Sequence, residues 1–255
     1  MKSALKLDTD LEFRVDSGTL NHDENVSQAP DQRKIFASRP LADAEAGIRR
    51  CLRAIGPIPE GDRYGAEWRA VEAWCISEGL IASTHCKPER KGGREHDLRQ
   101  ISGQGIWLKF TKPWSSGYAI NLSGNEPMLL PARPLQYLER LRLQNRFFGD
   151  CIRFFGITAD PKGRRIVISQ PDIIGQPPTW EELDMWFLRQ GYAKLNVKCL
   201  GGYDSVAYAG HGVAVFDVRP VNAVITASGV LLPIDVMMRR ISVSQIQKLL
   251  GPKKS

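Results

Sequence analysis

The spacing of apolar residues predicts helices in the first part of the chain. Apolar side chains recur at helical intervals from Ala42 to Ile55 and again from Ala66 to Glu78. A Gly-Pro segment interrupts the first pattern, and Gly79 ends the second. Residues 1 to about 45 mix Asp, Asn, Ser, Gln and Pro with little periodicity, which indicates a flexible or loosely docked extension.

Beyond residue 91 the pattern changes to short strands. Runs rich in β-branched and aromatic residues predict strands at residues 106–110, 151–155 and 165–169. A helix over residues 134–148 separates the first strand from the second. This alternation indicates a small β-rich unit that contains one helix.

The remainder of the chain continues the mixture of helices and strands. Thr179 and Glu182 have the spacing of a capping box, which predicts a helix beginning there. Short apolar runs at residues 213–216 and 229–234 predict two strands, and a final helix is expected over 243–250. The whole pattern is typical of the α+β class.

The composition is that of an ordinary globular protein. Of the 255 residues, 42% are hydrophobic and 25% are charged. No apolar run approaches the roughly 18–20 residues that span a bilayer, and the first eight residues lack the apolar core of a signal peptide. The five cysteines are scattered, with neither a C-x-x-C pair nor zinc spacing. We therefore expect a soluble, cytoplasmic protein with reduced thiols and no membrane partner.

The net charge changes this picture only slightly. A charge of +7 permits nucleic acid or another polyanion as partner. The basic residues are distributed along the chain instead of gathered in one run, which favours a solvated surface over a nucleic-acid site. The sequence carries no signal for an oligomeric state.

The most specific pattern in the chain joins Asp217, Asn222 and Asp235. The first two begin and end the segment Asp-Val-Arg-Pro-Val-Asn, which follows an apolar strand, and the third comes 18 residues after Asp217. Phosphoryl transfer needs a carboxylate beside the accepting hydroxyl and further oxygen ligands for Mg²⁺. The pattern favours Asp217 as a catalytic residue and the other two as metal ligands. The alternative is that Asp217 and Asn222 only form turns at strand ends.

A lysine in the strand at 106–110 is a candidate for holding phosphates. Lys109 interrupts an apolar strand, where a charge is costly unless it is paired, and Lys112 is the alternative. Glu139 is the only carboxylate in the 134–148 helix and shares a stripe with apolar neighbours. We expect a buried ion pair between Lys109 and Glu139, and a surface pair of Glu139 with Arg142 is the alternative.

Taken in order, these segments resemble a known family. They are Gly-Gly-x-Glu-His from residue 92, Trp-Leu-Lys-Phe-Thr-Lys-Pro from 107, the helix from 134, Ile-Ser-Gln-Pro-Asp-Ile-Ile-Gly from 168, Phe-Asp-Val-Arg-Pro-Val-Asn from 216 and Pro-Ile-Asp-Val from 233. They are similar to the serine/threonine/tyrosine protein-kinase-like domains of bacterial and phage polyvalent proteins. The resemblance covers roughly residues 67 to 236.

The resemblance implies a two-lobed protein-kinase-like fold. The expected divisions are an extension over 1–45, a helical segment over 46–90, a β-rich lobe with one key helix over 91–170 and a reduced second lobe over 171–255. It also implies roles for two loops. Gly92 and Gly93 would cover the phosphates of ATP. Gln170 and Asp172 would lie in the segment between the lobes, where the backbone of a kinase binds adenine.

The resulting expectation is an ATP- and Mg²⁺-dependent phosphotransferase that acts on a protein or a small molecule. The family context implies a role in conflict between phage or mobile elements and their hosts. Three alternatives remain open at this point. The first is a catalytically inactive kinase-like module that binds nucleotide or a partner, the second is an AMP transferase on the same fold, and the third is a nucleic-acid-binding protein.

Overall fold

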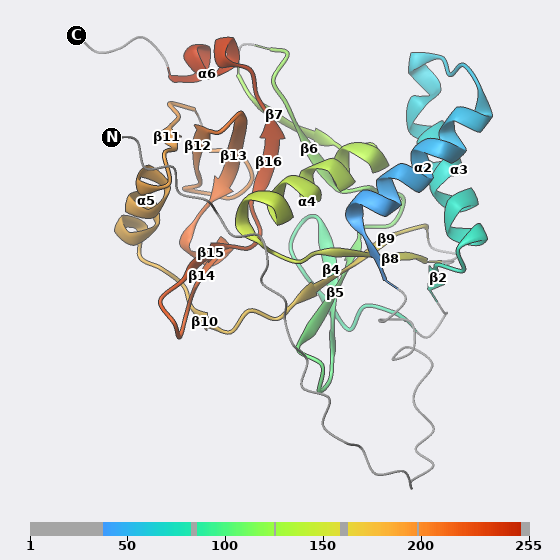
Figure 1. Ribbon diagram of the computed structural model, residues 1–255, viewed down its shortest axis with the longest axis horizontal. Helices are drawn as coiled ribbons and strands as arrows, with labels where there is room; N and C mark the ends of the chain where they lie inside the picture. The colour runs from blue at the N-terminus through green and yellow to red at the C-terminus, as the bar shows by residue number, and fades with distance from the viewer. Residues whose placement is uncertain (1–37, 83–85, 125, 159–162, 198, 251–255) are drawn as a thin grey trace, which may run out of the picture.

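The computed structural model of the chain confirms the α+β class. The structure describes residues 38–82, 86–124, 126–158, 163–197 and 199–250, so residues 1–37 of the expected extension lie outside the described part. In the described residues, five α-helices surround several mainly antiparallel sheets (Figure 1). None of these helices has the length and apolar character needed to cross a membrane.

A seven-stranded sheet organises the first two thirds of the chain. Its neighbouring strands are, in order, β1 (Arg39–Pro40), β8 (Arg153–Thr158), β9 (Ile166–Pro171), β5 (Ile106–Thr111), β4 (His96–Ile101) and β3 (Arg90–Lys91). These pairs are antiparallel, whereas β2 (Ile81–Ala82) joins β8 in parallel. Both β1 and β2 come from outside residues 91–170, so the predicted boundaries do not coincide with the edges of this sheet.

Three helices pack together above this sheet. They are α2 (Leu41–Ile55), α3 (Arg63–Ser77) and α4 (Pro134–Phe148), and their apolar faces share one core with β8 and β9. Trp74 of α3 packs on Phe154 of β8, with ring centroids 5.3 Å apart. The buried Glu67 carboxylate accepts a hydrogen bond from the Leu135 backbone at 3.0 Å, which joins α3 to the start of α4.

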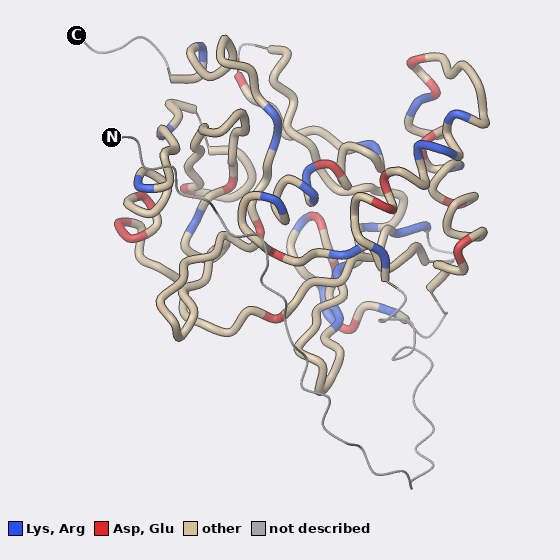
Figure 2. Tube along the Cα trace, viewed as in Figure 1, with Lys and Arg blue, Asp and Glu red and all other residues tan. Residues whose placement is uncertain are grey.

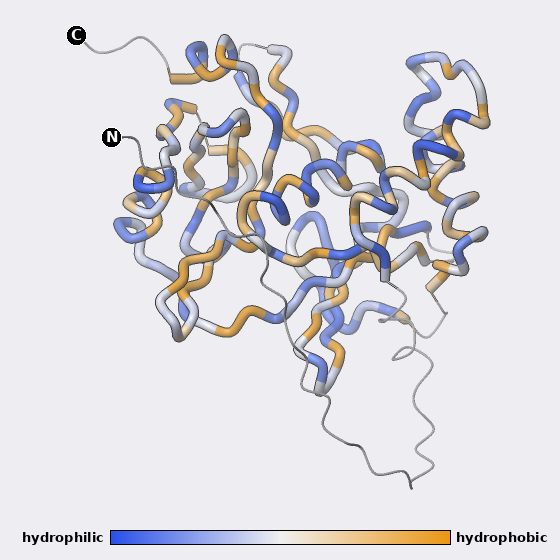
Figure 3. Tube along the Cα trace, in the orientation of Figure 1, coloured by the Kyte–Doolittle hydropathy of each residue, from blue (hydrophilic) through white to orange (hydrophobic). Residues whose placement is uncertain are grey.

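The C-terminal third forms two smaller sheets and two helices. One sheet contains β10 (Gly175–Gln176), β14 (Ala223–Thr226) and β15 (Leu231–Pro233), and the other contains β11 (Ala193–Lys194), β12 (Val206–Gly210), β13 (Val213–Val218) and β16 (Met237–Arg240). The hairpin of β6 (Tyr118–Asn121) and β7 (Met128–Pro131) and the helix α6 (Val243–Leu250) lie beside the second sheet (Figure 1). Figure 3 shows hydrophobic residues recurring along these strands.

Helix α5 (Trp180–Arg189) begins at the predicted capping box. The Glu182 amide donates to the Thr179 hydroxyl at 3.2 Å, while the Thr179 amide donates to the Glu182 carboxylate at 2.7 Å. Inside the helix, Phe187 stacks on Tyr208 of β12 with ring centroids 4.3 Å apart. The cap therefore sets the start of the helix, and the aromatic contact fixes the helix to the sheet.

Most predicted elements are confirmed, and the shifted ones have local causes. The helices over 134–148 and 243–250 have the expected bounds. The strand predicted at 151–155 begins only at Arg153, because the Asn145 side chain bonds both the carbonyl (2.7 Å) and the amide (2.8 Å) of Ile152. Cys151 just before it has a φ of 52°, so the chain turns there before it extends. The pattern did not predict β4 or the β6–β7 hairpin.

Replacing Gly47 by Ala tests the packing of α2 on α3. A Cβ at Gly47 would overlap the Trp74 indole, so Gly47→Ala should lower the free energy of unfolding by about 1–3 kcal/mol despite the better helix propensity of alanine. Gly61→Ala is the matched control, because a Cβ there meets no atom within 4 Å. Urea denaturation measures both, and equal midpoints for the two variants would contradict the close approach.

Candidate functional site

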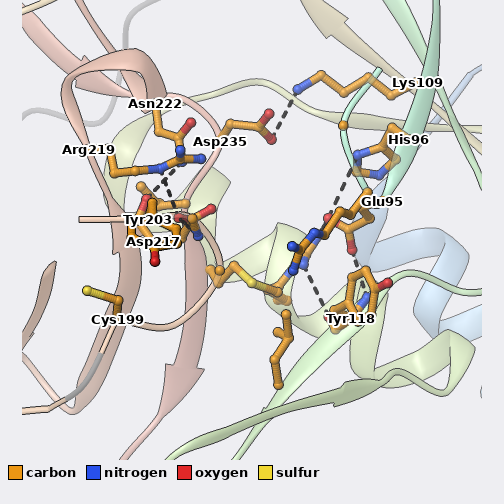
Figure 4. Close-up of a pocket in the computed structure, with 18 of the residues that line it drawn as sticks. Glu95, His96, Lys109, Tyr118, Cys199, Tyr203, Asp217, Arg219, Asn222 and Asp235 are labelled. Carbon is orange, nitrogen blue, oxygen red and sulfur yellow. Dashed lines mark hydrogen bonds and ion pairs between the residues drawn. The ribbon is translucent and has the colours of Figure 1, made fainter. Parts of the chain in front are cut away.

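A cavity of about 830 Å³ brings together residues from both halves of the chain. Its walls come from the turn between β3 and β4, from β5, α4 and the loop over 199–204, and from the ends of β13 and β15. Figure 4 shows Lys109 and Asp235 facing each other, with Asp217, Arg219 and Asn222 grouped on one wall. Five sequence-predicted residues line the cavity: Gly93, Lys109, Asp217, Asn222 and Asp235.

Lys109 of β5 forms an ion pair with Asp235. The Lys109 Nζ lies 3.3 Å from the Asp235 Oδ1. The lysine side chain is 14% exposed, whereas 55% of the aspartate side chain is accessible to solvent. The surrounding protein atoms raise the pKa of Asp235 even though its side chain is partly exposed, but the attraction of Lys109 outweighs this effect and holds the pKa below its usual range. Asp235 is therefore a carboxylate at neutral pH.

Asp217, the penultimate residue of β13, has a left-handed backbone conformation. Its φ is 55°, which aspartate tolerates better than most residues. The Gly202 amide donates to the Asp217 Oδ1 at 2.8 Å, and the Arg219 Nε lies 3.0 Å from the same oxygen. Burial raises the pKa of Asp217, and the bond from Gly202 and the charge of Arg219 only partly oppose the rise. Asp217 thus binds a proton more readily than an exposed aspartate.

Asn222 holds the segments of both aspartates. The side-chain NH₂ of Asn222 donates to the Asp217 backbone carbonyl at 2.8 Å. The backbone carbonyl of Asn222 accepts from the Ile234 amide at 2.9 Å. Asn222 ends the 3-10 turn Pro220–Asn222 and is 7% exposed. Because the amide nitrogen is used inside the loop, the side-chain oxygen is the atom that can serve as a ligand.

The remaining predicted residues do not line the cavity. Gly92 precedes the lining residue Gly93 in the β3–β4 turn. Gln170 is buried and donates to the Ile234 carbonyl at 3.2 Å, and Asp172 accepts from the Gln100 side chain at 3.0 Å. Both lie at the end of β9, where the chain leaves the large sheet for the C-terminal third.

The predicted ion pair between Lys109 and Glu139 is wrong. Glu139 pairs instead with Arg240 of β16 at 3.4 Å, and its side chain is 39% exposed. The next residue of helix α4, Arg140, lines the cavity in place of Glu139. The alternative surface pair of Glu139 with Arg142 is not the one observed either, because Arg142 pairs with Glu45 of α2 at 3.3 Å.

Sequence reasoning missed a buried ion pair beneath the β3–β4 turn. The Arg140 Nη2 lies 2.9 Å from the Glu95 Oε2, and Arg140 also donates to the Tyr118 carbonyl at 3.1 Å. The Tyr118 amide donates to the other Glu95 oxygen at 2.8 Å. Burial raises the pKa of Glu95, but the charge of Arg140 and its hydrogen bond overcome this effect and hold the pKa below its usual range. The pair anchors the turn that carries Gly93 to helix α4.

His96 is a second residue that the pattern did not reveal. Its Nε2 is 2.8 Å from the hydroxyl of the fully buried Tyr137 of α4. Burial lowers the pKa of His96 to about 4, although the charge of Glu95 opposes the shift. The imidazole is therefore neutral at physiological pH and joins β4 to α4 through a neutral hydrogen bond.

Asp150 lies behind the Asp235 segment in a buried polar cluster. The Gln144 side chain donates to the Asp150 carboxyl and to the Ile234 carbonyl, which Gln170 also contacts. Asp150 is 1% exposed, and burial raises its pKa to about 7 even though the charge of Lys109 opposes the shift. This cluster holds the Ile234 carbonyl, next to Asp235, through residues that do not line the cavity.

The acidic residues of the cavity suit a metal only in part. Among the described residues, no group of three or more His, Cys, Asp or Glu side chains is arranged to hold an ion. Asp235 and the Asn222 oxygen could supply two ligands. This fits Mg²⁺ better than zinc, because proteins usually hold Mg²⁺ through one or two carboxylates together with water and substrate phosphates. Elsewhere in the described chain, Lys, Arg, Asp and Glu are intermingled and are most frequent on the helices and on the large sheet (Figure 2).

Comparison with known proteins returned no relatives. No family model matches the chain, and neither a curated protein nor a solved structure matches it.

Ionisation of Asp150 should make the stability of the protein depend on pH. Because its pKa is raised to about 7 in the folded protein, its contribution to stability is complete below the unfolded pKa near 4 and is lost as the pH rises through 7. Asp150→Asn cannot ionise, so it should be the more stable protein above pH 7, by up to about 4 kcal/mol. The advantage should shrink between pH 7 and 4.

Urea denaturation across this pH range measures the effect. Asp172→Asn is the matched control, because Asp172 lies near the same strand end in an exposed contact with Gln100. A constant difference between wild type and Asp150→Asn at every pH would contradict the raised pKa.

Proposed function

We propose that the protein is an ATP- and Mg²⁺-dependent phosphotransferase that works with the residue layout of a protein kinase. The observation that carries the proposal is the convergence of Lys109, Asp217, Asn222 and Asp235 in one cavity. A lysine, an acceptor-side carboxylate and two oxygen ligands are the parts that phosphoryl transfer to a hydroxyl requires. The acceptor is a protein or a small molecule.

The order of the elements supports this proposal. A turn with Gly93 lines the cavity and leads into β4, the following strand β5 carries Lys109, and the β6–β7 hairpin, α4 and the strands β8 and β9 come next. The chain crosses to the loop with Asp217 and Asn222, makes the β14–β15 hairpin and arrives at Asp235. Protein kinases place their phosphate turn, lysine, helix, catalytic loop and metal-binding aspartate in the same order.

Each side chain receives a separate task in this proposal. Lys109 would leave Asp235 to bind the phosphates of ATP, and Asp235 and the Asn222 oxygen would hold Mg²⁺, which would supply charge neutralisation at the phosphates. Asp217 orients the acceptor hydroxyl and takes its proton, and its raised pKa makes it a better base than an exposed aspartate.

An inactive nucleotide-binding module is the second candidate. The specific observation in its favour is that α4 presents Arg140 to the cavity, whereas active protein kinases pair their lysine with a glutamate from this helix. Incubation with Mg²⁺ and ATP labelled at either the γ- or the α-phosphate separates the candidates. Transfer of the γ label supports the phosphotransferase, transfer of the α label indicates AMP transfer, and nucleotide binding without either indicates the module.

Asp235→Ala should weaken the metal-dependent part of ATP binding. Wild-type protein should bind ATP more tightly with Mg²⁺ than without it, because Asp235 would hold the ion and the ion would offset the charge of the phosphates. In the variant this gain should largely disappear, and Asp172→Ala should retain it, since Asp172 is outside the cavity lining. Calorimetric titration with and without Mg²⁺ measures the gain. The same gain in Asp235→Ala and wild type would remove Asp235 from the site.

Asp217→Asn should lower turnover by a factor on the order of 10²–10⁴ and leave ATP affinity nearly unchanged. Asparagine also tolerates a positive φ and can still accept the bond from Gly202, so the thermal midpoint should survive. Because the base must be ionised, wild-type turnover should fall as the pH drops through the raised pKa of Asp217. Turnover of the variant within about threefold of wild type would assign Asp217 to a structural turn.

A further inference from the structure

The loop over residues 199–205 lies directly against the proposed catalytic carboxylate. The Gly202 amide bonds the Asp217 Oδ1 at 2.8 Å. A Cβ at Gly201 would come within 2.5 Å of the Asp217 Cγ, and a Cβ at Gly202 would overlap the Arg219 guanidinium. Gly201, whose φ is 105°, therefore permits a close contact between this loop and Asp217 that a side chain would strain, whereas a side chain at Gly202 would displace the Arg219 guanidinium.

The base of this loop is closed by Ser205. Its hydroxyl both donates to the Leu200 carbonyl and accepts from the Leu200 amide, each at 3.1 Å, and Ser205 is 4% exposed. The bonds at Ser205 and Gly202 fix the backbone on both sides of Tyr203. The backbone of the loop is thus held at two points, and one of these points is the proposed catalytic residue.

Tyr203 stands at the tip of this loop with its side chain in solvent. It is 94% exposed, the highest value among the exposed large hydrophobic residues of the described chain. Because the aromatic ring is not buried, packing inside the protein does not explain a tyrosine at this position. Figure 4 shows Tyr203 beside Asp217, on the wall opposite His96 and Tyr118.

The chemistry of the cavity lining distinguishes Tyr203 further. Only two of the described lining residues carry a hydroxyl, Tyr118 and Tyr203. The Tyr118 backbone is tied to the Glu95–Arg140 pair on the other wall, away from Asp217. Tyr203 lines the cavity and directly follows the residue that bonds Asp217, and its exposed side chain is free to change rotamer.

We propose that Tyr203 is an intramolecular phosphate acceptor, so that the protein phosphorylates its own loop beside Asp217. This inference rests on the proposed phosphotransferase function. The Tyr203 oxygen forms a bond to the γ-phosphorus of ATP while the bond from that phosphorus to the β,γ-bridging oxygen breaks. The bonding electron pair leaves with ADP, and the phenol proton passes to the Asp217 carboxylate.

Phosphorylation at this position would change the loop through charge. A phosphotyrosine carries close to two negative charges near neutral pH and three acceptor oxygens. Arg219 lies against the same loop, at the contact with Gly202, and offers a partner for such an anion. A phosphate on Tyr203 would also place a negative group at the mouth of the cavity, where it would repel a second ATP molecule.

The test uses full-length protein that has first been treated with a phosphatase. It is incubated with Mg²⁺ and γ-labelled ATP, and the labelled residue is located by peptide mass spectrometry. We expect label on Tyr203. The fraction of the protein that is labelled per unit time should not depend on the protein concentration. Tyr203→Phe should lose the label without a change in thermal midpoint, and Tyr64→Phe should keep it, because Tyr64 bonds the Trp114 carbonyl outside the cavity.

Calorimetric binding of Mg²⁺–ATP, measured in parallel, separates the two levels of the proposal. If the protein binds Mg²⁺–ATP but carries no label, or carries it on Tyr118 or another residue, the acceptor assignment is overturned and the phosphotransferase proposal stands. If the fraction of protein labelled per unit time rises with protein concentration, the intramolecular route is overturned. Failure to bind Mg²⁺–ATP overturns both.

Discussion

Asn222 fixes the relative position of the two aspartate segments, and the geometry of the cavity depends on it. Its side chain bonds the Asp217 carbonyl and its backbone carbonyl bonds the Ile234 amide, next to Asp235. Because Asn222 is buried, water cannot replace these bonds without a desolvation cost. The left-handed turn at Asp217 and the return of the β14–β15 hairpin are thereby held together, and the two carboxylates keep a constant spacing.

Charge balance is the second constraint on this region. Two ion pairs line the cavity, Glu95 with Arg140 and Lys109 with Asp235. Each ion is partly removed from water, and the loss of one partner would leave an uncompensated charge at a cost of about 3–5 kcal/mol for a fully buried pair. The β3–β4 turn, helix α4 and strand β5 are consequently coupled through paired charges as well as through their apolar contacts.

The sequence predicted the features that are decided locally. The box at Thr179 positioned α5, and the spacing of Asp217, Asn222 and Asp235 led to three residues of one cavity. It failed at Glu139 because neighbouring positions on a helix differ by about 100° in direction, and α4 buries residues around most of its circumference. The partners Glu95 and Arg140 lie 45 residues apart, and in the fold each offsets the buried charge of the other. A pattern within a short stretch of sequence cannot predict an ion pair between such distant residues.

The Lys109–Asp235 contact has a thermodynamic consequence for whatever enters the cavity. An anion that arrives alone must separate Lys109 from Asp235 and leave the carboxylate without its partner, and a cation that arrives alone does the reverse. When both arrive, each side chain exchanges one counter-ion for another. The two ligands must therefore favour each other's binding by the same coupling free energy. The Lys109–Asp235 contact therefore makes the cavity discriminate against either ion by itself and accept an anion and a cation together.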